Sequence, residues 1–438
     1  MRIKNQFYGI FIISILSFSL ISFNIYKKLD IRSSFYLHNT SPNLSIILMI
    51  GDGMGYEHIK LAGLVENGKN NSFCMEALQY KSNVTTFSED NLVTDSAAAA
   101  TAMATGSKTN NGMLSVLPNL VILETILEIA QNLGRATGIV TTTSITHATP
   151  AAFMTHVPSR SSTSEIVTQI VEKASVDIIL GGGKSYFNST QISDLELNGY
   201  AYIENNTALM ESNSTKIIGL FAGDHLPYEI SRDPLLTPSL YNMTKKAIEQ
   251  LSKNPNGFFL MIEGGKIDHA AHANNKVDVA LETIEFNSAI DYAINYSIQS
   301  DNTLLIITAD HETGGLKILD NTLNDTLPSV FDSYEQKKML RIERANNISV
   351  SWSTTSHTAA DVPIFIFNPI SSQLENNCLI DNTKIFDIMH SFFYYNNKNT
   401  NSSNNPISGY QIGIIGIIVF SVIIIVKKKS IKGIKSSN

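Results

Sequence analysis

The chain has 438 residues, of which 43% are hydrophobic and 16% charged, so wholesale disorder, a collagen or coiled-coil rod and a small disulfide-stabilised scaffold are excluded. The net charge is −7, but residues 1–28 and 427–438 carry nine basic residues and no acidic one. The chain between these ends is therefore at about −16, which argues against nucleic-acid binding. Two cysteines, Cys74 and Cys378, are too few for a disulfide framework and could form one bridge in an oxidising compartment.

The N-terminal segment has the charge order of a targeting sequence. A long apolar stretch follows Arg2 and Lys4, as in a secretory signal peptide or a signal anchor. No small-x-small cleavage motif precedes Tyr26, so the two alternatives stay open. We expect residues 1–28 to direct the chain out of the cytoplasm.

The C-terminal segment has the features of a membrane anchor. Residues 410–426 are almost uninterruptedly apolar and long enough to span a bilayer of about 30 Å, and an Asn/Ser-rich spacer, residues 394–409, precedes them. The basic tail, residues 427–438, is predicted to be cytoplasmic by the positive-inside rule. We therefore expect a protein of the cell membrane whose folded domain is extracytoplasmic.

About a dozen Asn-x-Ser/Thr sequons agree with such a location and predict a glycoprotein, although an asparagine-rich chain also produces sequons by chance. They include Asn39, Asn83, Asn188, Asn213, Asn295 and Asn347.

Residues 29–393 are predicted to form one α/β domain. Apolar runs typical of buried strands cover Ser45–Gly51, Ala136–Thr143, Val176–Gly181, Phe258–Gly264 and Thr303–Thr308. Helical patterns cover Ala97–Thr105, Leu123–Leu133, Ser164–Ala174 and Val277–Ile298. This alternation favours a three-layer α/β/α fold with a mainly parallel central sheet, in which ligands bind at the carboxyl ends of the strands.

Candidate metal ligands follow these strands. Asp52 ends the first strand between two glycines, and Asp310 and His311 end the last one. Asp268 and His272 follow the fourth strand and share one face if their segment is helical. Alone, each of these residues could be a helix cap or a core histidine. Together they would repel one another without cations, and mixed Asp and His ligands suit catalytic zinc, whereas oxygen-only positions suit magnesium.

A candidate nucleophile opens an alanine-rich helical stretch. Ser96 follows Asp95 and precedes residues 97–105, so its hydroxyl lies at the positive end of a helix, which favours an alkoxide and a phosphate. Either Asp95 or Ser96 could instead be a simple N-cap. Arg160 could hold two phosphate oxygens with its planar guanidinium, or could form a surface ion pair.

Seven segments, in this order and spacing, resemble the signature blocks of the alkaline phosphatases. They are IGDGMG, VTDSAAAATAMATGSKTNNG, THATPAAFMTHVPSR, ILGGGKSYF, GFFLMIEGGKIDHAAH, TADHETGG and SHTAADVP. The resemblance extends from about Asn43 to about Pro369. It implies the three-layer α/β/α fold of the alkaline phosphatases and a metal-dependent phosphomonoester hydrolase of broad specificity with an alkaline pH optimum.

The resemblance also implies a role for individual residues. It assigns Ser96 as the nucleophile that forms a phosphoserine, Arg160 as the phosphate ligand and Asp95 as the residue that orients Arg160. It assigns two Zn²⁺, one to Asp268, His272 and His357 and one to Asp52, Asp310 and His311, and one Mg²⁺ to Asp52, Thr149 and Glu263. It further implies a homodimer that acts on small phosphomonoesters, with a variable crown insertion at residues 312–356.

Two positions depart from the pattern of the well-known bacterial members. Those members have Asp and Lys where this chain has His147 and His269, whereas vertebrate-like members have His at both. Both positions lie beside the third metal and the phosphate in the family. The identity of the third metal therefore stays open.

Three alternative functions have to be considered from the sequence: a sulfatase, a phosphodiesterase and a surface protein without catalytic activity. Sulfatases require a modifiable residue in a Cys/Ser-x-Pro-x-Arg setting, which Ser96 lacks, and diesterases of this fold typically use Thr as nucleophile without an arginine clamp. A glycosylated surface protein without turnover should show damaged ligands. All positions that the resemblance maps are filled, so these alternatives are disfavoured.

Overall fold

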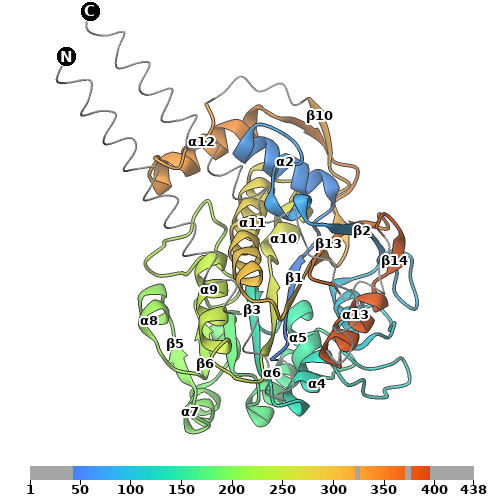
Figure 1. The fold of residues 1–438 in the computed structure, drawn as a ribbon, viewed down its shortest axis with the longest axis vertical. Coiled ribbons are helices and arrows are strands. Elements are labelled where there is room, and N and C mark those ends of the chain that lie inside the picture. The colour runs from blue at the N-terminus through green and yellow to red at the C-terminus, as the bar shows by residue number, and fades with distance from the viewer. Residues whose placement is uncertain (1–42, 321–325, 370–375, 395–438) are drawn as a thin grey trace, which may run out of the picture. The chain divides into compact units, whose positions relative to one another are not determined.

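The computed structural model describes residues 43–320, 326–369 and 376–394, and a ten-stranded sheet forms its centre (Figure 1). The strand order is β14-β2-β13-β8-β1-β7-β3-β4-β6-β5. The strands are β1 (Ser45–Gly51), β2 (Tyr80–Thr85), β3 (Ala136–Ser144), β4 (Ile178–Gly182), β5 (Ala201–Ile203), β6 (Ile217–Leu220), β7 (Phe258–Glu263), β8 (Thr303–Ala309), β13 (Val362–Phe367) and β14 (Leu379–Asp381). Two short antiparallel pairs lie outside it: β9 (Glu312–Thr313) with β12 (His357–Thr358), and β10 (Lys317–Asp320) with β11 (Ser349–Ser351).

The central strands are parallel and end at the same edge of the sheet. β8, β1, β7 and β3 pair in parallel in that order, whereas β13 is antiparallel to β8 and β2. The register places Gly51 beside Ala309, and Ile50 beside Glu263. Every residue of these four strands is buried, as expected for continuous apolar strands covered on both faces. The residues that follow them therefore meet at one edge.

Helices cover both faces of the sheet, which confirms the predicted layered α/β fold (Figure 1). One packed group consists of α2 (Tyr56–Asn67), α9 (Leu240–Leu251) and α11 (Lys276–Gln299), and a second consists of α3 (Ser96–Thr105), α4 (Ile126–Asn132), α5 (Ala148–Met154) and α13 (Thr383–Phe393). The longer helices are α2 (Tyr56–Asn67), α3 (Ser96–Thr105), α6 (Thr163–Lys173), α7 (Ser189–Leu197), α9 (Leu240–Leu251), α11 (Lys276–Gln299), α12 (Tyr334–Asn347) and α13 (Thr383–Phe393). The shorter ones are α4 (Ile126–Asn132), α5 (Ala148–Met154), α8 (Asn206–Glu211), α10 (Lys266–His272) and the 3₁₀ turns η1 (Cys74–Ala77) and η2 (Lys184–Tyr186).

The predicted elements agree with the observed ones to within three residues at each end. The largest difference is at α4, which was expected to begin at Leu123 and begins at Ile126. The reason is a capping box, in which Thr125 Oγ1 accepts the N–H of Glu128 at 3.2 Å and Glu128 Oε2 accepts the N–H of Thr125 at 3.0 Å. The segment with Asp268 and His272 is helical, as the interpretation of their spacing required.

The predicted crown segment, residues 312–356, is tied to α2 by buried polar contacts. Arg344 in α12 is 1% exposed and donates from Nε and Nη2 to the carbonyls of Val65 and Leu64, at 2.7 and 2.8 Å. These carbonyls lie at the C-terminal end of α2, where helices lack internal donors and favour cations. Because α2 begins directly after the loop that carries Asp52, this contact supports the edge of the sheet where the candidate ligands lie.

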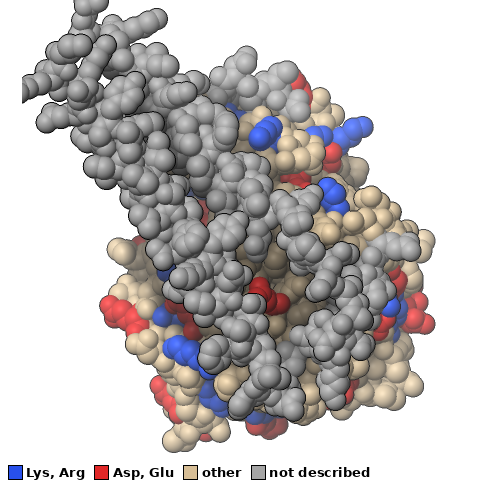
Figure 2. Space-filling model, in the orientation of Figure 1, with Lys and Arg blue, Asp and Glu red and all other residues tan. Residues whose placement is uncertain are grey.

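Charged side chains of both signs lie side by side on the visible described surface (Figure 2). The ion pairs among the described residues include Lys60–Glu57 at 3.2 Å and Lys173–Glu128 at 2.9 Å. Interspersed charge of this kind is typical of an ordinary solvated surface.

Several predictions concern segments that lie outside the described residues. These are the signal segment 1–28, the spacer 394–409 beyond Tyr394, the transmembrane helix 410–426 and the basic tail 427–438. Within the described ranges, no helix is both long and apolar enough to cross a membrane. The terminal membrane segments and the domain boundaries stay predictions.

Candidate active site

The carboxyl ends of β1 and β8 carry three buried candidate ligands, which we call the inner set: Asp52, Asp310 and His311. His311 Nε2 lies 3.5 Å from Asp52 Oδ1 and 3.2 Å from Asp310 Oδ2, and all three side chains are buried. Ligand atoms around a tetrahedral zinc with bonds of about 2.1 Å lie about 3.4 Å apart. The spacing of the inner set therefore suits one such cation.

Three more candidate ligands, the outer set, lie next to it: Asp268, His272 and His357. His272 Nε2 lies 3.3 Å from Asp268 Oδ2 and 3.1 Å from His357 Nε2. His357 Nε2 lies 3.7 Å from Asp268 Oδ1. The His311 and His357 rings stack with centroids 3.5 Å apart, so the two sets adjoin. Because the His272 side chain is 39% exposed, the outer set is the one closer to solvent.

Hydrogen bonds at Nδ1 orient both imidazoles of the outer set. His272 Nδ1 contacts the carbonyl of Thr355 at 2.6 Å, and His357 Nδ1 contacts the carbonyl of Thr94 at 2.9 Å. A carbonyl only accepts, so Nδ1 carries the proton and Nε2 keeps a free lone pair. This is the arrangement that metal-binding histidines require.

A third group lies at the ends of β1, β3 and β7. Asp52, His147 and Glu263 each offer one ligand atom, and these atoms all lie within 4.8 Å of one another. Burial and the charge of Arg160 lower the pKa of His147 well below its usual range, so its imidazole is neutral. Thr149, in the first turn of α5, is fully buried.

Buried atoms of these groups lack hydrogen-bond partners among the described residues. They are both Asp52 carboxylate oxygens, His147 Nδ1, Thr149 Oγ1, Glu263 Oε1 and Asp310 Oδ2. Buried polar atoms without partners are costly and rare, and the carboxylate and hydroxyl oxygens among these are of kinds that coordinate cations. The donor atoms present therefore fit bound metal ions.

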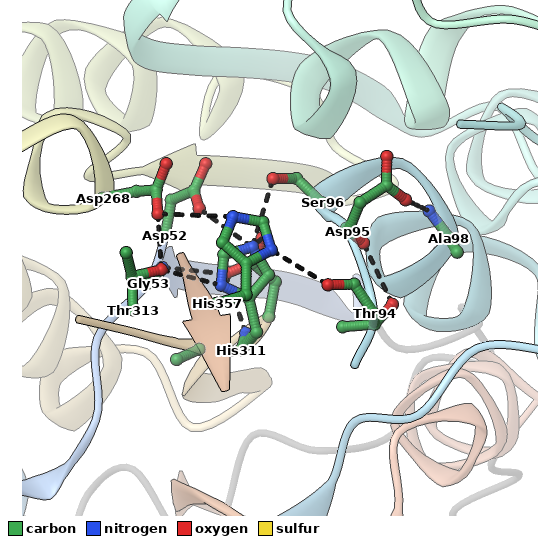
Figure 3. Close-up of polar contacts among 12 residues, drawn as sticks. Asp52, Gly53, Thr94, Asp95, Ser96, Ala98, Asp268, His311, Thr313 and His357 are labelled. Atoms are coloured by element: carbon green, nitrogen blue, oxygen red, sulfur yellow. Dashed lines mark hydrogen bonds and ion pairs between the residues drawn. The ribbon is translucent and has the colours of Figure 1, made fainter. Parts of the chain in front are cut away.

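Ser96 is the first residue of α3, and its hydroxyl is turned toward the inner set (Figure 3). Ser96 Oγ lies 3.2 Å from His311 Nε2, where the inner set converges. Asp95 is the N-cap of the helix, because its Oδ1 accepts the N–H of Ala98 at 3.0 Å. The N-cap interpretation of Asp95 is thus correct, and it leaves the Ser96 hydroxyl pointing into the site.

Arg160 lies between Asp95 and the third group. Its Nη1 donates to Asp95 Oδ2 at 2.9 Å and its Nη2 donates to His147 Nε2 at 3.0 Å. His269 lies nearby, with its ring centroid 5.7 Å from that of His147, and burial followed by the charge of His225 lowers its pKa to about 4. The structure thus brings every predicted site residue to one edge of the sheet.

The electrostatics of the site favour the binding of cations. Burial, and then the charge of Asp310, raises the pKa of Asp52 well above its usual range. Burial also raises the pKa of Asp310 to about 6 and that of Glu263 to about 7. Burial and the neighbouring His357 hold the pKa of His311 well below its usual range. Divalent cations would relieve this repulsion and displace the protons.

Several residues around the site were missed at the level of sequence. Thr141 Oγ1 donates to Glu263 Oε2, and Thr143 Oγ1 donates to the same oxygen at 3.2 Å. Thr141 and Thr143 are two residues apart on a strand that ends at the site, so their side chains lie on the same face of the sheet. This spacing could have identified them from the sequence. His225 accepts a backbone N–H at the end of β3 and its ring lies 4.5 Å from that of His269, but no motif surrounds it in the sequence.

Comparison with known proteins decides the family. Residues 43–395 match the sequence model described as alkaline phosphatase. The chain belongs to the alkaline phosphatase family. Alkaline phosphatase 3 of Bacillus subtilis (strain 168) is 33% identical over 417 residues, which cover 81% of this chain and 90% of that protein.

Solved alkaline phosphatases share the fold. The cold-active alkaline phosphatase from the psychrophile Shewanella sp. is 31% identical with a TM-score of 0.70, covering 80% of this chain and 100% of that one. A His-to-Asp variant of the alkaline phosphatase from the Antarctic bacterium TAB5, with Mg bound in its M3 site, is 29% identical with a TM-score of 0.67, covering 81% and 99%. This alkaline phosphatase is thus a metal-dependent phosphomonoesterase, and the resemblance seen in its motifs is confirmed.

Proposed function

We propose that this alkaline phosphatase hydrolyses a broad range of small phosphate monoesters, with an alkaline pH optimum, through a phosphoserine on Ser96. The observation that carries this proposal is the position of Ser96 Oγ at the N-terminus of α3, 3.2 Å from His311 Nε2. A hydroxyl placed there faces both the positive helix end and the candidate metal ligands. The other groups around it are suited to the phosphoryl group rather than to the alcohol, which accounts for broad specificity.

The reaction is a double displacement. Ser96 Oγ loses its proton and attacks phosphorus, the bond from phosphorus to the ester oxygen breaks, and the alcohol leaves with a proton from solvent. Water then attacks the phosphoserine, which releases inorganic phosphate and restores the Ser96 hydroxyl. Arg160 holds two non-bridging oxygens with its planar guanidinium, and Asp95 keeps Arg160 in place through the contact at 2.9 Å.

The residues present fit two Zn²⁺ and one Mg²⁺. The carboxylate-rich inner set and the histidine-rich outer set would each hold one zinc. Asp52, Thr149 and Glu263 each have a buried oxygen without a hydrogen-bond partner among the described residues, and these three would hold magnesium. When bound, these cations supply positive charge to the phosphoryl group and lower the pKa of a coordinated hydroxyl or water. Asp52 belongs to two groups and would bridge them.

His147 is proposed to decide which metal occupies the third group. Exchange of this neutral imidazole for a carboxylate would add a hard oxygen donor and a negative charge beside the third group, which favours magnesium. The variant of the Antarctic relative supports this idea, since it combines a His-to-Asp exchange with Mg in its M3 site. We expect His147→Asp to lower the Mg²⁺ concentration for half-maximal activation about 10-fold or more. His269→Asp is the matched control, and an equal shift in both variants would contradict a specific role of His147.

Substrate class is tested by comparing a monoester with its diester. We expect full-length protein to release p-nitrophenol from p-nitrophenyl phosphate far faster than from bis-p-nitrophenyl phosphate, and to hydrolyse unrelated monoesters with similar kcat/KM. The reason is that Arg160 and the cations require the non-bridging oxygens of a monoester dianion. A preference for the diester would overturn the proposal.

We also infer a homodimer at the cell membrane with the catalytic domain outside the cytoplasm. The support for the location is the basic and apolar order of residues 1–28 and the apolar stretch 410–426 followed by lysines. The support for the dimer is the resemblance to the family.

A further inference from the structure

Thr313 is a buried residue that contacts both candidate zinc sets (Figure 3). It ends β9, and its Oγ1 lies 2.6 Å from Asp268 Oδ1 of the outer set and 3.2 Å from His311 Nδ1 of the inner set. Its side chain is fully buried, so water does not compete for these contacts. One hydroxyl therefore joins two groups that would hold different cations.

The Thr313 hydroxyl has one proton and can therefore donate to only one of its two partners. Asp268 is an acceptor when ionised, and its contact with Thr313 is the shorter of the two, so Thr313 donates to Asp268. The Thr313 oxygen then accepts the Nδ1–H of His311. This arrangement leaves the proton of neutral His311 on Nδ1 and the lone pair of Nε2 free, toward Ser96 Oγ at 3.2 Å.

The other two histidines do not depend on a side chain in this way. His272 and His357 direct Nδ1 at backbone carbonyls, which accept and never donate. For His311 the corresponding partner is the Thr313 hydroxyl. A substitution that removes the Thr313 hydroxyl therefore removes two contacts at once. One is the contact that fixes the tautomer of His311, and the other is the hydrogen bond to Asp268.

The backbone around Thr313 is built to allow this contact. The N–H of Thr313 donates to the carbonyl of Gly53 at 3.1 Å, and β9 pairs with β12, which carries His357. Gly53 has φ +70°, and a Cβ at this position would lie 2.8 Å from both Asp268 Oδ1 and Thr313 Oγ1. The glycine after Asp52 thus leaves space for the hydrogen bond between these two side chains.

We propose that Thr313 is a positioning residue that holds Asp268 in the outer set and His311 in the inner set, and so slows the loss of both zinc ions. The inference rests on the proposed zinc sites. The partners of metal ligands typically contribute 10- to 100-fold to metal affinity. Thr313 touches neither the phosphoryl group nor the reacting oxygen in this account.

The test measures zinc release from full-length holoenzyme to a colorimetric chelator. Thr313→Val keeps the shape and loses the hydroxyl, Thr313→Ala loses the hydroxyl without crowding Asp268, and Thr313→Ser keeps it. We expect release about 10-fold or more faster in the Val and Ala variants and within about 3-fold of wild type in Thr313→Ser. Thermal stability of the metal-free proteins serves as the control for general structural damage.

The outcomes separate the inference from the proposed function. Wild type that binds no zinc would overturn both. Wild type that binds two zinc ions, with equal release from wild type and from the Val or Ala variant, would overturn the role of Thr313 alone. Faster release in Thr313→Ser as well would also overturn it, because the hydroxyl is then not the group that matters. The Ala variant decides the question if the Val variant does not fold.

Discussion

Replacing Ser96 with alanine is expected to lower kcat for p-nitrophenyl phosphate by about 10⁴-fold or more, because the reaction loses its nucleophile. The fold should be retained, since Asp95 and not Ser96 caps α3 through Ala98. For the full-length protein, steady-state kinetics measures kcat, metal analysis measures the zinc content, and thermal unfolding measures the melting temperature. Activity should fall while zinc content and melting temperature stay near those of wild type.

Ser107→Ala provides the matched control for this experiment. Ser107 lies just beyond the C-terminal end of α3, after Gly106, so the same chemical change is made at the opposite end of the same helix. We expect wild-type activity in this variant. Retention of more than about a tenth of the activity by Ser96→Ala would contradict the assignment of the nucleophile.

Removal of the metals is expected to abolish activity and to lower stability by an amount that grows with pH. In the metal-free protein, burial raises the pKa of Glu263 from the ordinary value of 4.5 to about 7 and that of Asp310 from the ordinary value of 3.8 to about 6. A carboxyl whose pKa is raised by folding stabilises the folded state below its unfolded pKa, and this contribution is lost as the pH rises through the folded pKa. Bound cations favour the ionised carboxylates and reverse this trend.

Thermal unfolding with and without chelator at pH 5, 6, 7 and 8 measures this effect. We expect the difference in melting temperature to increase between pH 5 and pH 8 and to reach about 10 °C at pH 8, as for ligands present far above their Kd. Activity should return when zinc and magnesium are added back. Glu263→Gln removes one titrating group and should show a smaller increase. A difference that is the same at pH 5 and pH 8 would contradict the account.

The central strands and the residues that end them could be predicted from sequence for a physical reason. Strands buried on both faces are continuous apolar runs, so a polar residue such as Asp52 or Asp310 marks the strand end directly. The proximity of Asp268 and His272 could be predicted because residues four apart lie on the same face of a helix. The N-terminus of α3 could be predicted from the polar residues that precede the run of alanines.

The contacts between these segments could not be predicted from the sequence in the same way. The hydrogen bond from Thr313 to Asp268 joins residues 45 apart, and the contact of His225 with His269 depends on a loop that has no motif. Both depend on the order β8-β1-β7-β3, which is set by long-range pairing rather than by local pattern. The resemblance to the family supplied the ligand sets, and the structure supplied the residues that support them.

The central claim, a phosphoserine at Ser96, is tested most directly by trapping phosphate on the enzyme. Full-length protein is quenched in acid during turnover of p-nitrophenyl phosphate, digested and analysed by mass spectrometry. The account predicts covalent phosphate on the peptide that contains Ser96, and none on that peptide in Ser96→Ala. Turnover without covalent phosphate at any time or acidity, or phosphate on another residue, would contradict it.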